Sequence, residues 1–138
     1  MIGSHLIRTW SSTQRVIALS SGEAEYYGCV RAGSHLLGIS SMMQDLGIPK
    51  KRLRIKTDAS VAKSLASRRG LGGIRHIEVN QLWIQEKVRK KEIELRKVSG
   101  LDNLADALTK AVDHEDIKKH LEGTNQVIGS GRHSIMPE

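Results

Sequence analysis

The spacing of hydrophobic residues changes along the first half of the chain from that of strands to that of a helix. Leu6–Trp10 predicts a short strand, and Val16–Leu19 predicts either a second strand or an extended lead-in to the next element. Over residues 20–47, apolar residues recur every three or four positions, which predicts one long amphipathic helix. The expected inward-facing stripe consists of Cys29, Ala32, Leu36, Ile39, Met43 and Leu46. The Ser-Ser-Gly sequence at 20–22 offers the N-cap, and Gly47 ends the helix.

The second half of the chain alternates between the two spacings. It predicts strands over 52–57 and 93–98, and helices over 59–67, 75–91, 103–111 and 113–121. Because helices lie between the two strands, at least one pair of strands should be parallel. The sequence therefore predicts a mixed α/β domain over residues 1–122. The glycine-rich, polar residues 123–138 predict a poorly ordered tail.

Length and composition narrow the class of protein. The 138 residues suffice for one compact domain, and 38% apolar residues without a phenylalanine imply an aliphatic core. Cys29 is the single cysteine, which excludes a disulfide framework and a cysteine-based zinc site. No apolar run approaches the roughly 18 residues of a membrane span. We expect an intracellular protein without a membrane partner, in the cytoplasm or the nucleus.

The charge of +7 is concentrated in the middle of the chain. Residues 50–100 hold 15 of the 22 lysines and arginines, but five of the 15 acidic residues. Such a basic block suits a polyanionic partner, because each phosphate that a cation neutralises releases condensed counterions. A solvated basic surface without a partner is the alternative that charge alone leaves open.

Three acidic motifs place a carboxylate at or near the boundary of an expected element. Glu23 and Glu25 begin the long helix, Asp58 follows the strand over 52–57, and Asp106 lies near the start of the helix over 103–111. Carboxylates from separate elements can converge, and their oxygens are the ligands that Mg²⁺ prefers. In a basic protein this pattern indicates phosphodiester cleavage, in which two metal ions about 4 Å apart activate water and stabilise the leaving oxygen.

Each of these carboxylates also has a structural alternative. Glu25 precedes Cys29 by four residues and should share its inward-facing stripe, which favours Glu25 as a ligand and Glu23 as a solvated cap. Asp58 is alternatively the N-cap of the helix that follows it. Asp106 is expected inside its helix, where aspartate is unfavourable, whereas Asp102 suits the cap, so a chemical role is favoured for Asp106.

Seven segments, in this order along the chain, carry a resemblance to a known family. They are Trp10–Ser12, Val16–Tyr26, Lys56–Ala62, Arg75–Val79, Trp83–Val88, Glu92–Leu95 and Leu104–Lys110. The second is similar to A-L-S-S-T-E-A-E-Y and the last to L-A-D-x-L-T-K of the ribonuclease H domain in copia-type LTR retrotransposon polyproteins. The resemblance is collinear over about residues 5–112.

The resemblance implies a ribonuclease H fold, a mixed five-stranded sheet flanked by helices. It implies cleavage of the RNA strand of an RNA–DNA hybrid by four carboxylates in the order Asp, Glu, Asp, Asp, which hold two Mg²⁺ ions, with Mn²⁺ as an alternative. Matched motif by motif, the glutamate is Glu25, the middle aspartate is Asp58 and the last is Asp106.

The sequence departs from the family at the first carboxylate. The family's first catalytic aspartate lies on its first strand, whereas this sequence has no acidic residue before Glu23. We therefore expect a ribonuclease H-like sheet that lacks the first strand and most of the second. We also expect the chain to be either a segment of a longer polyprotein with a reverse transcriptase segment upstream, or a decayed copy that starts at an internal methionine.

The basic residues around the glycine-rich stretch near residue 70 are the candidates for nucleic-acid binding. Arg68, Arg69 and Arg75 should contact the phosphate backbone, which needs only cations at suitable places. His76 is a further candidate for a phosphate contact, with a structural role at the start of a helix as its alternative. The other functions to consider are a catalytically dead remnant that still binds nucleic acid and a non-functional product of a degenerate element.

Overall fold

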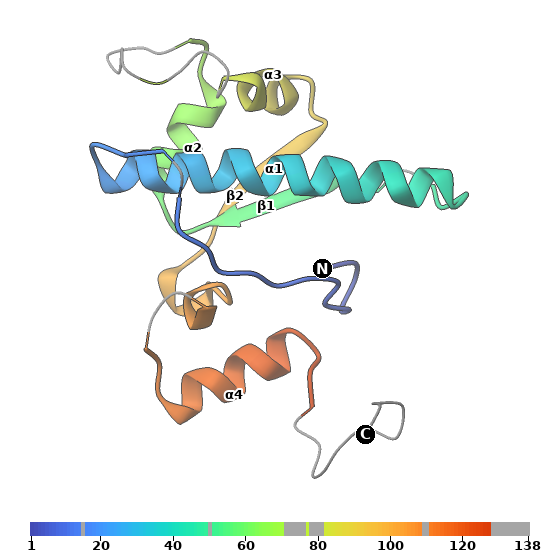
Figure 1. Ribbon diagram of the computed structural model, residues 1–138, viewed down its shortest axis with the longest axis vertical. Coiled ribbons are helices and arrows are strands. Elements are labelled where there is room, and N and C mark those ends of the chain that lie inside the picture. Colours follow the sequence, from blue (N-terminus) through green and yellow to red (C-terminus); the bar gives the residue numbers. More distant parts are fainter. Residues whose placement is uncertain (15, 50, 71–76, 78–81, 109–110, 128–138) are drawn as a thin grey trace. The chain divides into compact units, whose positions relative to one another are not determined.

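The computed structural model describes residues 1–14, 16–49, 51–70, 77, 82–108 and 111–127. The chain forms two compact units. The smaller unit combines residues 1–12 with the chain from residue 104 onward, and the larger unit spans residues 13–103. Figure 1 follows the elements of both units in the order of the sequence.

A parallel pair of strands forms the centre of the larger unit. The strands β1 (Leu53–Thr57) and β2 (Ile93–Lys97) pair in register from Leu53 opposite Ile93 to Thr57 opposite Lys97. The helices α2 (Ser60–Ser67) and α3 (Trp83–Arg89) lie between them in sequence. The predicted parallel pair and the mixed α/β class are confirmed, and the arrangement is consistent with a ribonuclease H-like sheet that lacks strands.

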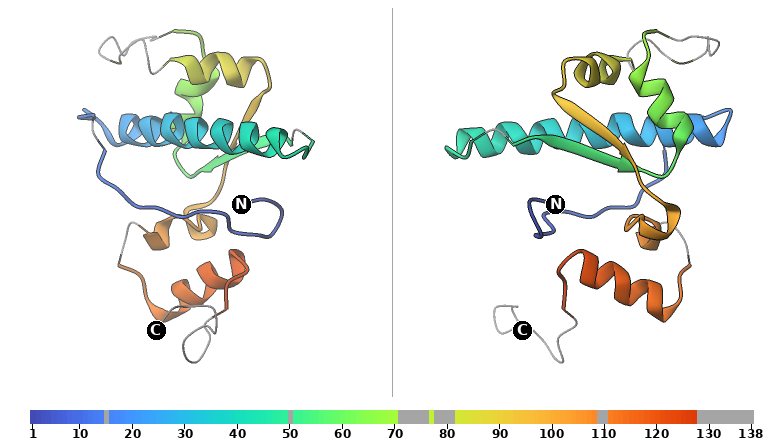
Figure 2. Two further views of the ribbon diagram at one scale, coloured as in Figure 1. Left: turned by 45° about the vertical axis from the view of Figure 1, so that its right-hand side comes forward. Right: turned by 180° about the vertical axis from the view of Figure 1, so that it is seen from behind.

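The long helix α1 (Ser21–Asp45) covers one face of this sheet (Figure 2). The core between them contains Tyr26, Val30, Ile55, Ile93 and Leu95, all buried. Gly33 lets α1 approach closely, because a Cβ atom at this position would lie 3.1 Å from Trp83 and 3.3 Å from Ile84. The opposite face of the sheet is polar, since the residues that alternate with the buried ones are charged.

The predicted bounds of α1 are confirmed at both ends. The Ser20 side chain caps the first turn by accepting a hydrogen bond from the Glu23 N–H. At the other end Gly47 adopts a φ of +75°, and its N–H donates to the Gln44 carbonyl while the Ile48 N–H donates to the Met43 carbonyl. This pair of bonds is a Schellman motif, which satisfies carbonyls that the helix end would otherwise leave unpaired.

The predicted inward-facing stripe of α1 is confirmed in part: Cys29 is buried and Ala32 and Leu36 pack against the core, but the stripe is off-centre. The buried positions centre on Tyr26, Val30 and Gly33, and Leu46 at the end of the predicted stripe is 70% exposed. Spacing reveals that a helix has an apolar side, but α2, β1 and the start of α3 decide which side is covered. Tyr26 and Tyr27, which the stripe left out, are among the buried residues.

The predicted strand over Leu6–Trp10 is also wrong. Among the described residues, the only pairing near the amino terminus is an isolated antiparallel bridge between Ile2 and His5. A strand requires a neighbour for its backbone N–H and C=O groups, and no described strand pairs with this segment. Residues 16–19 match the extended alternative, because Val16 and Ala18 pack against the core while the residues between and after them are exposed.

Two further helices differ from their predicted extents. Of the helix predicted over 75–91, the structure shows residues 83–89; residues 75–76 and 78–81 lie outside the described part, and Ile77 is buried. The helix predicted over 103–111 is wrong. The single 3₁₀ turn η2 (Gly100–Asp102) ends just before this range, and Asn103 after it has extended backbone. A second 3₁₀ turn, η3 (Asp106–Leu108), lies within the range.

The smaller unit contains the predicted last helix as α4 (His114–Gly123). Asp113 caps it by accepting a hydrogen bond from the Asp116 N–H at 2.9 Å. Leu104 packs against Gly123, where a Cβ atom would lie 2.6 Å from the leucine side chain. Thr124 after the helix is buried and donates to the His120 carbonyl; residues 128–138 of the predicted tail lie outside the described part. No helix in the described ranges is both long and apolar enough to cross a bilayer.

Candidate metal and nucleic-acid site

The first turn of α1 is fixed by a reciprocal pair of hydrogen bonds. Ser20 accepts from the Glu23 N–H at 3.2 Å, and the Glu23 carboxylate accepts from the Leu19 N–H at 2.8 Å. This is close to a capping box, in which a serine and a glutamate three residues later satisfy N–H groups at a helix start. Glu23 is 2% exposed, so its predicted capping role is confirmed but the prediction that it is solvated is wrong.

Glu25 lies on the side of α1 next to the buried face, not on it. Its side chain is exposed, which contradicts the expectation that it shares an inward-facing stripe. The physical reason is the phase of the helix, because Tyr26 and Val30 occupy the centre of the covered face. An exposed carboxylate is nevertheless accessible to a metal ion and to a substrate, so its predicted role as a ligand stays a prediction.

Cys29 connects this part of α1 to the end of β1. Burial raises the pKa of the Cys29 thiol to about 11, the nearby Glu25 carboxylate raises it further, and a side-chain hydrogen bond with Thr57 acts in the opposite direction. Thr57 is the last residue of β1, and Asp58 follows it directly. Glu25 and Thr57 are therefore both close to the buried Cys29 thiol, and Asp58 is the residue next to Thr57.

The structure argues against the structural alternative for Asp58. The N-cap of α2 is Ala59, which has no side-chain cap, and the Ala59 N–H donates instead to the Thr57 hydroxyl at 3.2 Å. Asp58 is partly buried, and among the described residues no hydrogen bond or ion pair engages its carboxylate. Gly100 lies close to this carboxylate, since a Cβ atom built on Gly100 would lie 4.0 Å from Asp58 Oδ2.

Asp106 belongs to the smaller unit and begins the short turn η3. The expectation that it lies inside a helix, with Asp102 as the cap, is wrong, because Ser99 caps η2 and the longer helix is absent from the described residues. Within the described ranges, no three His, Cys, Asp or Glu side chains lie close enough to hold a metal ion. The three-carboxylate metal site therefore stays a prediction.

The basic turn after α2 contains two of the predicted nucleic-acid-binding residues. Arg68 and Arg69 are both exposed there. Burial raises the pKa of Tyr26 to about 12, and the positive charge of Arg68 works weakly against this rise, so Arg68 lies near the tyrosine that follows Glu25. Because α2 packs against α1, the turn at its end lies near the start of α1.

A glutamine that sequence analysis overlooked holds this turn in place. The Gln85 amide on α3 donates to the carbonyls of Leu65 and Gly70 at 2.9 and 3.1 Å, and its oxygen accepts from the Gly70 N–H at 2.9 Å. Gly70 has a φ of +68°, which favours glycine. The adjacent basic, glycine-containing turn was the available signal.

The other two predicted nucleic-acid-binding residues, Arg75 and His76, lie outside the described residues. Their predicted contacts with phosphate stay predictions.

The chain is similar to segments of transposon polyproteins. It is 32% identical to the retrovirus-related Pol polyprotein from transposon TNT 1-94 of Nicotiana tabacum. The alignment spans 106 residues, or 75% of this chain. It is 29% identical over 111 residues, 79% of the chain, to each of the Pol polyproteins from transposons RE1 and RE2 of Arabidopsis thaliana. No family model matches the chain, and no solved structure matches it.

The chain is therefore homologous to a segment of retrovirus-related Pol polyproteins from plant transposons. The matched segment makes up 8% of the length of each of these polyproteins. The match supports the resemblance to retrotransposon polyproteins that the sequence motifs indicated.

Proposed function

We propose that the chain is the ribonuclease H-type segment of a retrotransposon polyprotein and acts on the RNA strand of RNA–DNA hybrids. The observation that carries this proposal is the shared neighbourhood of Glu25 and the end of β1 around Cys29, together with an Asp58 that caps no helix. The basic turn beside the same stretch of α1 and the homology to Pol polyproteins support it.

The donor groups fit the metal that this activity requires. Glu25 and Asp58 offer carboxylate oxygens, which suit hard cations such as Mg²⁺ or Mn²⁺, and both carboxylates are at least partly accessible. In the proposal they are joined by Asp106 and by a fourth carboxylate from polyprotein sequence upstream of this segment. When bound, the two ions would supply an activated water and stabilise the leaving oxygen.

The protein's own residues would bind and orient the substrate. Arg68 and Arg69 would contact phosphates of the hybrid, since exposed guanidinium groups donate two hydrogen bonds to a phosphate. Gln85 would keep their turn in one conformation through its three hydrogen bonds. Recognition would depend on the shape of the hybrid and on 2′-hydroxyl groups, not on base sequence.

The test is cleavage of a hybrid with labelled RNA by the chain extended to include its upstream polyprotein segment. We expect Mg²⁺-dependent cleavage that Asp58→Asn and Glu25→Gln each reduce by about 10²-fold or more, because each substitution removes a charged ligand. Glu115→Gln on α4 is the matched control and should leave the rate unchanged. A rate that is the same with and without the two site substitutions would refute the proposal.

A second candidate function is a nucleic-acid-binding remnant without catalysis. It is favoured by the lack of a three-ligand group among the described residues, alongside an intact basic turn. In that case the extended chain should bind the hybrid but not cleave it in Mg²⁺ or Mn²⁺. The substitutions Glu25→Gln and Asp58→Asn should leave this binding unchanged.

A further inference from the structure

The outer face of the β1–β2 sheet, turned away from α1, carries a row of cations. On β1 the exposed residues Arg54 and Lys56 alternate with buried ones, and exposed Arg52 continues the row before the strand. On β2 the same face presents Glu94 and Arg96, which pair in register with Arg54 and Lys56. The face therefore holds four cations and one anion.

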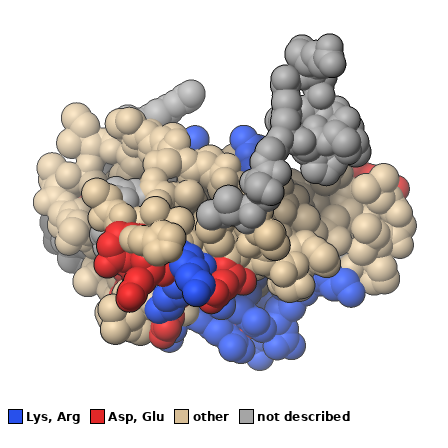
Figure 3. Space-filling view, turned by 90° about the horizontal axis from the view of Figure 1, so that it is seen from below, with Lys and Arg blue, Asp and Glu red and all other residues tan. Residues whose placement is uncertain are grey.

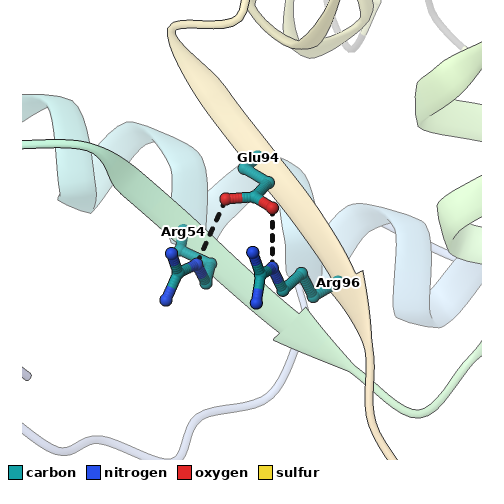
Figure 4. Close-up of polar contacts among 3 residues, drawn as sticks. All are labelled: Arg54, Glu94 and Arg96. Carbon is teal, nitrogen blue, oxygen red and sulfur yellow. Dashed lines mark hydrogen bonds and ion pairs between the residues drawn. The ribbon is translucent and has the colours of Figure 1, made fainter.

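The single anion organises this face. Glu94 accepts a hydrogen bond from Arg54 Nε at 3.2 Å and from Arg96 Nε at 2.6 Å, so one carboxylate fixes two guanidinium groups side by side (Figure 4). Neither bond uses the terminal nitrogens of the arginines, which are the donors that bind phosphate in bidentate fashion. The two positive neighbours lower the pKa of Glu94, which keeps it charged.

The arrangement is a row and not a compact pocket. Same-face residues on one strand lie about 6.6 Å apart, and the neighbouring strand lies about 4.8 Å away. A solvated surface normally mixes charges of both signs. Figure 3 shows a cluster of lysine and arginine side chains with acidic side chains beside it, whereas the sheet face itself has Glu94 as its one anion among four cations. A row of cations suits a partner with repeating negative charge.

We propose that this outer sheet face, formed by Arg52, Arg54, Lys56 and Arg96, binds the phosphate backbone of a nucleic acid. The surface is distinct from the turn that carries Arg68 and Arg69, and it needs neither the candidate carboxylates nor a metal ion. The expected occupant is a duplex or structured strand, held without regard to its base sequence, because contacts to phosphate position a nucleic acid but do not specify it.

The test compares Arg52→Gln/Lys56→Gln with the control Lys118→Gln/Lys119→Gln, which removes the same charge from exposed positions on α4. Binding of the full chain to a fluorescent RNA–DNA hybrid is measured by anisotropy in EDTA, between about 50 and 200 mM salt. Because EDTA prevents cleavage, failure of this proposal is distinguishable from failure of the proposed function.

We expect the slope of log affinity against log salt to become shallower by about 2 in the sheet-face variant, since two fewer phosphates are neutralised, and to stay unchanged in the control. An unchanged slope in the sheet-face variant, or an equal change in the control, overturns the proposal. The proposal is also overturned if the sheet-face variant no longer binds a polyglutamate peptide but binds the hybrid as before. That result would indicate an acidic protein as the partner.

A second measurement uses the unsubstituted chain, so that its result does not depend on whether a variant folds. The hybrid should slow acetylation of Lys56 several-fold and leave that of Lys118 unchanged, as followed by mass spectrometry. Equal acetylation of Lys56 with and without the hybrid contradicts the proposal.

Discussion

The two halves of α1 have similar apolar spacing but very different surroundings. In the first half Tyr26, Val30 and Gly33 are buried against α2, the sheet and α3. In the second half Ser40 is the only buried residue, and the Met42 side chain is 53% exposed. The difference shows that amphipathic spacing makes a helix able to pack, while burial depends on which elements the chain brings to each turn. The candidate carboxylate Glu25 lies in the well-packed half.

Truncating a side chain in each half should give the largest contrast. Tyr26→Ala removes a fully buried ring and should lower the free energy of unfolding by about 3–5 kcal/mol, as large core truncations do. Met42→Ala should change it by less than about 0.5 kcal/mol. Urea denaturation followed by circular dichroism measures both, and similar losses would show that the second half is packed in solution.

Two glycines of α1 offer a finer comparison. Gly33→Ala should be less favourable than Gly38→Ala, because the new Cβ atom meets Trp83 and Ile84 at 3.1 and 3.3 Å and these side chains must shift to admit it. Gly38→Ala has nothing within 4 Å of its Cβ atom and should stabilise the helix by about 0.5–1 kcal/mol. The melting temperature of Gly33→Ala should therefore lie below that of Gly38→Ala, and an equal or higher value would contradict the packing of this helix.

Alkaline pH should weaken the packed half by a smaller amount. Burial raises the pKa of Cys29 from 9.0 to about 11 and that of Tyr26 from 10.0 to about 12, so the unfolded chain loses these protons first. Stability is then fully present below about pH 9 and falls as the pH rises toward 11 and 12. We expect a loss of about 1 kcal/mol between about pH 8 and pH 10.

Cys29→Ala removes one of these two groups and serves as the control. Its urea midpoint should depend less steeply on pH over the same interval. If the slope of the variant equals that of the unsubstituted chain, the thiol does not contribute to the pH dependence.

Much of the fold could be predicted from local pattern. Strict alternation located β1 and β2 to within a residue, and the Ser20 cap and Gly47 located the ends of α1, because these signals depend only on neighbouring residues. The strand over Leu6–Trp10 and the helix over 103–111 could not be judged in this way. A strand needs a hydrogen-bonding neighbour, and a short helix needs a surface to cover.

The candidate site, too, was predictable from the sequence only in part. The motif identified Glu25 and Asp58, but their environment followed from contacts that the spacing does not reveal. Thr57, not Asp58, bonds the Ala59 N–H, and Tyr26 takes the inward-facing position that had been assigned to the stripe of Glu25. Gln85 was overlooked because its three partners are 15 and 20 residues away.

The sequence by itself determined the alternation of strands and helices, the concentration of positive charge and the relation to transposon polyproteins, because each resides in residue type and order. Only the tertiary structure decided which face of α1 is buried, that Glu23 is inside and Glu25 outside, and that Glu94 holds two arginines on one sheet face. These features join residues that are distant in the chain, and the free energy of burial and pairing depends on that proximity.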